Sequence, residues 1–412
     1  MYCLSVSNLQ PDQVLAKAVY SDRGTAWLKA GTVLNERYIE LLRSKGVGNV
    51  FIEDQATADI VVHDLITPEL RAQVTSEVGN EFAAGDTVAA KLRGAPPLKI
   101  LEWMATREGR RSIATEFPVI ETHEMATSMV DEILMAPSSS ALTTLKTLDS
   151  YTVTHCVDTA AVAVAIGKRL NVSRRDLIRL ARGCLLHDIG LIFIDQELLN
   201  KTELLTAAEL KALAHHTVFG FELLKQLQPD DIVPNHITLQ HHERQDGHGY
   251  PRGLRGTNHF HCGLADRDRG AIMALAEIAA VADVYDALSS NRPYRPALPP
   301  EDVVAVLGRV AGTQLNKEIV DAFLSMLPVF PLGSVVQITT TRYRYCRALV
   351  ARINRDDLAR PIIRVISDPL GRPLPPVDID LRQNAALQIS TMAVGHGSAD
   401  LEMEMAARLV PV

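Results

Sequence analysis

One stretch of the chain holds most of its histidines. Ten of the thirteen lie between His155 and His261, and the pairs His187-Asp188 and His241-His242 fall within this stretch. Imidazole is the commonest neutral metal ligand near pH 7, and a carboxylate can bridge two ions. Because apolar residues recur at helical spacing around these histidines, the sequence predicts a metal site assembled from several helices. Such a site can produce hydroxide at neutral pH and hydrolyse phosphate esters.

Composition limits the class of protein and its partners. The 412 residues are 47% apolar and 22% charged, which is ordinary for a globular chain of two or three domains. The net charge is −7, and no long basic block appears, so we expect no nucleic-acid polymer as partner. The five cysteines are scattered and include no CxxC motif, which favours a reducing compartment. With no signal peptide and no long apolar run, we expect a cytoplasmic protein without a membrane span.

Changes in residue pattern divide the chain into four expected segments. Residues 1–65 predict a small α+β regulatory module, and residues 66–149 a helical connecting region. Residues 150–328 have apolar residues at helical spacing throughout, except in the loop 244–268. Residues 329–412 predict a β-rich segment with a tail, which could pack on the helices or form a small barrel-like cap. The predicted fold is therefore multi-domain, with an all-α bundle at its centre. The expected helices are 36–45, 154–170, 173–186, 206–227, 234–242, 271–289 and 300–310, and the expected strands are 18–20, 26–28, 49–52, 334–340, 348–353 and 362–366.

Two of the expected helices end on histidine pairs with metal-binding chemistry. The pair His187-Asp188 follows an apolar run, where a buried charge is costly unless it is paired or bound to a metal. The pair His241-His242 also closes a helix, and its last turn can direct both rings to one centre. A carboxylate at position 188 can bridge two cations while His187 binds one of them.

The remaining candidates are chosen by helical geometry. His215 and His216 are adjacent within 206–227, and adjacent helical positions point about 100° apart, so we expect only one of them to face inward. Gly220, four residues on, leaves space beside His216, which favours His216. Asp283 and Asp286 lie three residues apart on one face of an otherwise apolar helix. This spacing suggests Asp283 as a metal ligand and Asp286 as a carboxylate that orients one.

Together these motifs resemble the HD-GYP family, a branch of the HD phosphohydrolases, between about residues 150 and 328. The motifs are His187-Asp188-Ile189-Gly190, His241-His242-Glu243, Gly249-Tyr250-Pro251, Asp283-Val284-Tyr285-Asp286-Ala287-Leu288 and Arg292-Pro293-Tyr294-Arg295. The resemblance implies an all-helical domain that holds two or three metal ions and hydrolyses cyclic dinucleotides, chiefly cyclic di-GMP.

The resemblance also implies roles for particular residues. One metal would be held by His155, His187, Asp188 and Asp283, and a second by His216, His241 and His242, with Asp188 bridging the two. A hydroxide between the metals would open the cyclic dinucleotide to linear pGpG, or through it to GMP, with Asp188 and His187 as the catalytic residues. Iron or manganese is the expected metal, and the ligand set also permits zinc. The substrate-binding candidates are Tyr250, Arg292 and Arg295, and the supporting residues are Asp286, Gly249 and Pro251.

The chain departs from the family pattern at several positions. Leu191 stands where a lysine would contact the substrate phosphate, so phosphate binding is weaker or depends on another cation. Tyr151 stands where trinuclear members have glutamate, so we expect two metals. Glu277 replaces an arginine that is usual in the family. Residues 252–270 are an insertion that contains His259, His261 and Cys262. It is either a lid over the site, whose histidines could be extra ligands, or a solvated loop.

Three functions stay open at this stage. The first is a metal-dependent cyclic di-GMP phosphodiesterase. The second, which Leu191 and Glu277 favour, is a receptor that binds a cyclic dinucleotide with slow turnover or none and signals to a partner. The third is a phosphohydrolase for another phosphate ester, against which the Gly-Tyr-Pro loop weighs. The ligand is cyclic di-GMP or a mixed cyclic dinucleotide, and the N-terminal module could support a homodimer or bind a protein partner.

Overall fold

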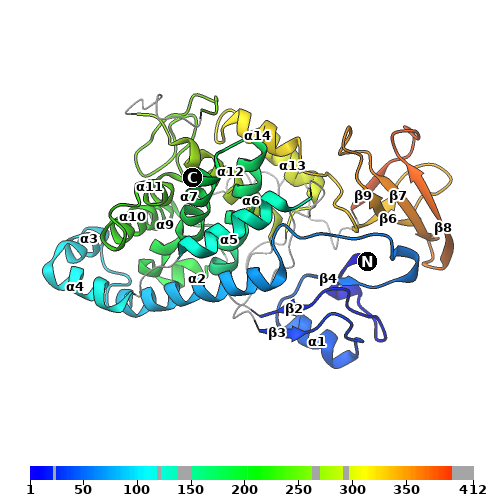
Figure 1. Ribbon diagram of the computed structural model, residues 1–412, viewed down its shortest axis with the longest axis horizontal. Coiled ribbons are helices and arrows are strands. Elements are labelled where there is room, and N and C mark those ends of the chain that lie inside the picture. The colour runs from blue at the N-terminus through cyan, green and yellow to red at the C-terminus, as the bar shows by residue number, and fades with distance from the viewer. Residues whose placement is uncertain are drawn as a thin grey trace.

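The computed structural model confirms the predicted fold class: a helical core accompanied by a small N-terminal module and a C-terminal antiparallel sheet (Figure 1). It describes residues 1–21, 25–117, 122–137, 151–201, 203–261, 270–290 and 297–391.

The N-terminal module is built from two strand pairs and one helix. The helix is capped by Asn35, whose side chain accepts a hydrogen bond from the backbone N–H of Tyr38. The first strand was not predicted, and an isolated bridge pairs Val14 with Val33. The elements are β1 (Tyr2–Ser5) paired with β4 (Asn49–Ile52), β2 (Val19–Tyr20) paired with β3 (Ala26–Leu28), helix α1 (Glu36–Ser44), and the 3₁₀ helices η1 (Val6–Asn8) and η2 (Gln55–Thr57).

The helical core surrounds one buried helix, α12. Every residue of α12 from Leu275 to Leu288 is buried, and α6, α11, α13 and α14 pack around it. Such a helix can carry polar side chains only where other buried groups meet them. The helices are α2 (Pro68–Ala89), α3 (Pro97–Ala105), α4 (Arg107–Glu116), α5 (Thr122–Met135), α6 (Tyr151–Arg169), α7 (Arg174–Leu186), η3 (Ile189–Phe193), α8 (Gln196–Leu199), α9 (Ala207–Ala214), α10 (His216–Leu227), α11 (Ile232–Gln240), α12 (Ala274–Ser289), α13 (Pro300–Val310) and α14 (Lys317–Leu324).

The prediction of a single helix at 206–227 is wrong, because this segment is divided at His215 into α9 and α10. A tertiary contact accompanies the division. The first turn of α10 lies so close to η3 that a Cβ added at Gly190 would stand 2.0 Å from the carbonyl oxygen of His216. A side chain of any size at position 190 would therefore force the two elements apart.

The C-terminal sheet is open and fully antiparallel, with the strand order β8-β7-β6-β5-β9. Its edge strand β8 was not predicted, because Pro373, Pro375 and Pro376 argue against a strand; an edge position tolerates them. The strands are β5 (Val335–Ile338), β6 (Arg347–Arg352), β7 (Ile362–Ser367), β8 (Pro373–Asp380) and β9 (Ile389–Thr391).

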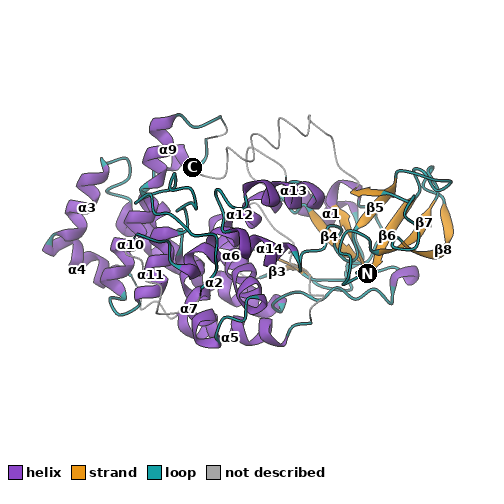
Figure 2. Ribbon diagram, turned by 90° about the horizontal axis from the view of Figure 1, so that it is seen from above, coloured by secondary structure: helices purple, strands orange, loops and turns teal. Residues whose placement is uncertain are grey.

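The sheet packs on the N-terminal module, and the strands of both gather at one end of the molecule (Figure 2). Phe51 and Ile60 share a buried cluster with Leu349 of β6. The Arg364 guanidinium binds Asp59 across the same contact, with an Nη1–Oδ1 distance of 2.6 Å. Parts of the chain about three hundred residues apart thus form one packed unit.

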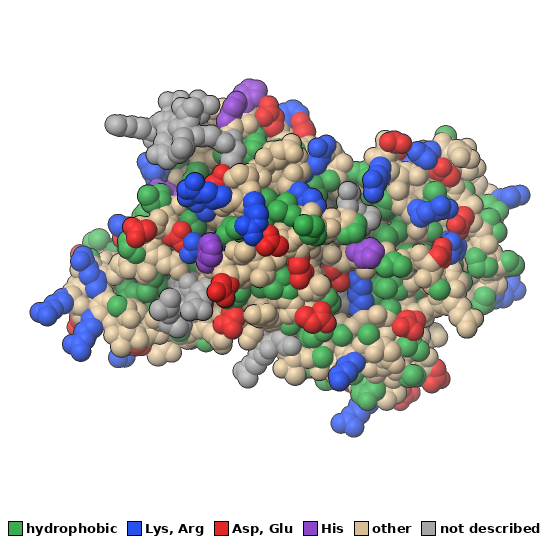
Figure 3. Space-filling model, in the orientation of Figure 1, with side chains coloured by type: hydrophobic (Ala, Val, Ile, Leu, Met, Phe, Trp, Pro, Cys, Tyr) green, Lys and Arg blue, Asp and Glu red, His purple; other side chains and the backbone are tan. Residues whose placement is uncertain are grey.

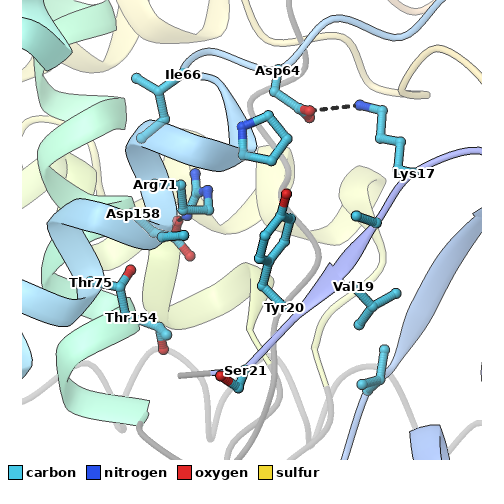
Figure 4. Close-up of a pocket in the computed structure, with 14 residues that line it drawn as sticks. Lys17, Val19, Tyr20, Ser21, Asp64, Ile66, Arg71, Thr75, Thr154 and Asp158 are labelled. Carbon is cyan, nitrogen blue, oxygen red and sulfur yellow. Dashed lines mark hydrogen bonds and ion pairs between the residues drawn. The ribbon is translucent and has the colours of Figure 1, made fainter. Parts of the chain in front are cut away.

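The N-terminal module meets the helical core around a cavity of about 90 Å³ (Figure 4). Tyr20 of β2 lines it, and the ion pair between Arg71 of α2 and Asp158 of α6 lies in its wall. Asp158 is buried and lies three residues after His155 on the same helix. The module therefore lines one cavity together with the helix that supplies a predicted metal ligand.

None of the described helices combines the length and apolar character needed to cross a bilayer. On the face shown in Figure 3, cationic and anionic side chains are intermingled over the helical part and the sheet.

Candidate metal centre

The structure brings the predicted histidines and aspartates together from five helices. His155 comes from α6 and His216 begins α10. His187 and His241 are the C-cap residues of α7 and α11, and each is followed directly by another member of the group. Two sets of these residues have ligand atoms within 4.8 Å of one another: His155, His187 and Asp188 in the first cluster, and Asp188, His216, His241 and His242 in the second.

Asp188 belongs to both clusters because its two oxygens face different histidines. Its Oδ2 lies 3.6 Å from Nε2 of His187 and 3.9 Å from Nε2 of His155. Its Oδ1 lies 3.4 Å from Nε2 of His216 and 3.9 Å from Nε2 of His241. The carboxylate is thus placed to bridge two cations.

Backbone carbonyls at helix ends fix the orientation of three rings. Nδ1 of His187 donates to the carbonyl of Cys184 at 2.7 Å, and Nδ1 of His241 donates to that of Thr238 at 2.9 Å. The last carbonyls of a helix have no partner within the helix, so they are free to accept these bonds. Nδ1 of His216 similarly lies 2.8 Å from the carbonyl of Leu213. Because carbonyls only accept, each Nδ1 carries a proton, and Nε2, which faces Asp188, is the atom left to bind a metal.

His155 is oriented by carboxylates instead. Its Nδ1 lies 2.7 Å from Oδ2 of Asp286, and its Nε2 lies 3.0 Å from Oδ1 of Asp283. Asp286 is itself supported by Ser290, whose hydroxyl donates to its backbone carbonyl at 2.6 Å. A carboxylate behind a metal-binding histidine holds the ring and increases its basicity.

The two clusters differ in their proton affinity. Burial disfavours charge on His155, but hydrogen bonds to Asp283 and Asp286 prevail and raise its pKa to about 10. Burial also opposes charge on His187, yet the neighbouring Asp188 raises its pKa to about 10. In the second cluster burial prevails: it lowers the pKa values of His216 and His241, and that of His242 to about 3.

The donor set fits divalent cations. Nε2 of His187 is buried without a hydrogen-bond partner. Nε2 of His216 and Nε2 of His241 lie 3.4 Å apart. No hydrogen bond can join them, because neither Nε2 carries a proton when the proton is on Nδ1. Lone pairs that converge on a carboxylate are satisfied by a cation, and a mixed imidazole and carboxylate set suits iron, manganese or zinc.

The Gly-Tyr-Pro loop forms one side of this centre. The ring centroid of Tyr250 lies 4.9 Å from that of His242, and its backbone N–H donates to the His242 carbonyl. Burial raises the pKa of Tyr250 well above its ordinary value, so the phenol stays protonated and can donate a hydrogen bond. At Gly249 a Cβ would lie 2.5 Å from the His242 carbonyl oxygen, so only glycine fits there. Pro251 follows through a cis peptide bond.

Glu243, which follows the His241-His242 pair, holds the Gly-Tyr-Pro loop. Its carboxylate is buried and accepts the backbone N–H groups of Arg252 and Leu254, at 2.8 and 2.7 Å. It thereby closes the loop that contains Tyr250. An acidic residue between two histidines and a glycine-rich loop could have suggested this role.

Other predicted residues lie away from the centre or outside the described residues. Leu191 packs against the hydrophobic core from η3. His259 binds Glu318 of α14, with an Nδ1–Oε1 distance of 2.8 Å, and so is occupied away from the histidine clusters. Arg292 and Arg295 lie outside the described residues.

Several similar proteins are named as phosphodiesterases of cyclic dinucleotides. The chain is 26% identical to the cyclic di-GMP phosphodiesterase PA4108 of Pseudomonas aeruginosa, over 86% of this chain and 82% of that protein. It is 37% identical to the cyclic di-GMP phosphodiesterase response regulator RpfG of Xanthomonas campestris pv. campestris, over 40% of each chain. It is 32% identical to the 3'3'-cGAMP-specific phosphodiesterase 3 of Vibrio cholerae, over 44% of this chain and 36% of that protein.

The match to a protein family covers the part of the chain that contains both clusters. Residues 132–319 match the family model described as HD domain. This segment of the chain is therefore similar to an HD domain, and the Gly-Tyr-Pro loop is packed beside its histidines.

Proposed function

We propose that the protein is a metal-dependent phosphodiesterase that opens a cyclic dinucleotide, with cyclic di-GMP as the preferred candidate and 3'3'-cGAMP as the alternative. The observation that carries the proposal is Asp188, whose two oxygens face two separate groups of histidines. The names of the relatives supply the substrate class.

In this proposal His155, His187, Asp188 and Asp283 hold one ion, and His216, His241 and His242 hold the second together with Asp188. Two divalent ions there would activate water as a nucleophile and neutralise charge on the phosphate oxygens. The chain's own residues set the geometry: the carbonyls behind His187, His216 and His241 direct Nε2 inward, and Asp286 does so for His155.

Substrate enters, in this proposal, from the side where Asp188, His242 and Tyr250 are partly exposed, since the other ligands are buried. The Tyr250 phenol donates a hydrogen bond to the ligand there. Leu191 offers no charge, so Arg292 and Arg295 are the proposed cations for the phosphates.

A receptor with slow turnover is the second candidate, and the apolar Leu191 is the observation that favours it. The same metal centre would then bind the intact cyclic dinucleotide. The two functions differ in whether a product forms.

The test is to load the protein anaerobically with Mn²⁺ or Fe²⁺ and to separate the products formed from cyclic di-GMP and from 3'3'-cGAMP. We expect a linear dinucleotide, two ions per chain, and loss of both activity and metal in His216→Ala. The matched control is His215→Ala, because His215 is adjacent but binds the Lys211 carbonyl outside the clusters. Tight binding without product would favour the receptor, and neither binding nor product would contradict both functions.

A further inference from the structure

Glu277 is a buried carboxylate that the proposed mechanism does not use. It lies in the first turn of α12 and is 6% exposed. The side chains that donate hydrogen bonds to its carboxylate are neutral amides, and burial raises the pKa of Glu277 to about 7. A buried carboxylate with neutral partners is costly, so its position requires an explanation.

Its two oxygens each accept a hydrogen bond from a side-chain amide. Oε1 accepts from Nε2 of Gln245 at 2.6 Å, and Oε2 accepts from Nδ2 of Asn316 at 3.1 Å. Gln245 lies in the loop that follows His242, and Asn316 caps the N-terminus of α14. One carboxylate therefore joins three segments that are far apart in the sequence.

The Gln245 side chain is fixed from both sides. While its Nε2 donates to Glu277, its Oε1 accepts from the backbone N–H of Asn258 at 3.0 Å. A Cβ added at Gly256 would lie 1.9 Å from Oε1, so the amide occupies the space beside this glycine. Gln245 thus ties the end of the loop near Asn258 to the start of the loop.

Asn258 continues these contacts to α14. Its Oδ1 accepts from the backbone N–H of Lys317 at 3.0 Å, and its Nδ2 donates to the carbonyl of Gly312 at 2.9 Å. We call Glu277, Gln245, Asn258 and Asn316 the Glu277 network. The network joins both ends of the loop of residues 244–258, which contains Tyr250, to α12 and to the start of α14.

We propose that Glu277 is a positioning residue for ligand binding. Through the Glu277 network it fixes the loop of residues 244–258 against the helix that supplies Asp283, and so sets the position of Tyr250 beside His242. The glutamate that replaces the family's usual arginine then supports binding in this chain. The identity of the ligand in this inference rests on the proposed function. The effect of Glu277 on the loop does not.

Hydrogen-bond chemistry gives a selective way to break and restore this network. Glu277→Gln places an amide NH₂ against one of two amide donors, so one bond is lost. The double variant Glu277→Gln with Gln245→Glu reverses the first bond, because the amide introduced at position 277 would donate to the carboxylate introduced at position 245. That carboxylate still accepts from the backbone N–H of Asn258, while Asn316 donates to the amide oxygen at position 277. Every bond of the network is then retained.

The experiment compares the full-length, metal-loaded wild type, the single variant and the double variant. The matched control is Glu81→Gln, because Glu81 is also buried with a pKa raised to about 7, but lies on α2. Amide hydrogen exchange of residues 244–258, metal content, and KM and kcat for cyclic di-GMP are measured, with the dissociation constant of cyclic di-GMP replacing KM if no turnover occurs.

We expect faster exchange in residues 244–258 and a KM or dissociation constant raised about tenfold in Glu277→Gln, with kcat and metal content unchanged. The double variant is expected to return both values to those of the wild type, and Glu81→Gln to match the wild type. Unchanged exchange and affinity in Glu277→Gln, or no rescue by the double variant, would overturn the inference. If the wild type neither binds nor cleaves cyclic di-GMP, the proposed function fails, and exchange alone then decides whether Glu277 positions the loop.

Discussion

Protons and metal ions compete for the same nitrogens in only one of the two clusters. Asp283 and Asp286 stabilise the charged form of His155, and Asp188 does so for His187. The rings of the second cluster are kept neutral by burial. At pH 7 the metal-free protein therefore has protonated imidazoles in the first cluster and free lone pairs in the second.

The pH dependence of metal binding follows from this difference. Because His155 and His187 have pKa values near 10 without metal, each must release a proton when a cation binds at pH 7, so affinity in the first cluster rises with pH up to about 10. The second cluster binds at pH 7 without proton release. Calorimetric titration with Mn²⁺ in two buffers of different ionisation enthalpy measures the protons released. Binding heats that are independent of the buffer would contradict this prediction.

The chemistry of single residues was enough to select the candidate ligands, but not the network that supports the loop. Adjacent histidines and aspartates in apolar helices are conspicuous in a sequence, and the structure brings the seven predicted ligands together, with Asp283 beside His155. Their roles as ligands stay a prediction. Glu277 was noted only as a departure, because its partners Gln245 and Asn316 lie 32 and 39 residues away and carry no motif.

At the scale of elements, the second cluster depends on contact between η3 and α10. Gly190 follows Asp188 by two residues and touches the carbonyl of His216, the first residue of α10. Gly220 of α10 lies against the backbone of Gly190 in turn. The distance between Asp188 and His216 is thus set by two glycines.

Gly190→Ala is expected to separate these elements. The added Cβ would meet backbone atoms, which cannot move aside as a side chain can, so we expect a destabilisation of roughly 1–3 kcal/mol and loss of metal from the second cluster. Denaturant unfolding and metal analysis measure the two effects. The control is Gly308→Ala in α13, where nothing lies within 4 Å of the added Cβ and helix propensity favours alanine. Equal stability and metal content in the two variants would refute this account.

Apolar spacing and capping residues predicted those helices whose bounds are set by interactions within the segment itself. The helix at 300–310 is confirmed with its exact bounds, and that at 173–186 with Ser173 as its cap. The break at His215 was missed, because the apolar spacing continues across it while a contact with η3 sets the geometry. Strand β8 was missed because proline is excluded from central strands but not from edges.

At the scale of the whole molecule, the N-terminal module and the C-terminal sheet form one unit beside the helical core. Alternate residues of β6 face opposite sides: Ala348 and Val350 belong to the sheet's own core, and Leu349 and Ala351 to the cluster shared with the N-terminal module. This is why the middle of β6 is buried on both faces. The sequence could suggest a doubly buried strand but not which distant segment covers it.

This packing makes the stability of the N-terminal module depend on the C-terminal sheet. Leu349→Ala would leave a cavity between Phe51 and the sheet, so we expect a loss of roughly 2–5 kcal/mol in unfolding free energy and faster amide exchange in β4 (Asn49–Ile52). Exchange in α12 should stay unchanged, because α12 belongs to a separate cluster. The matched control is Val377→Ala on β8, whose side chain is 47% exposed. If β4 exchanged equally in both variants, the N-terminal module and the sheet would be independent units that merely touch.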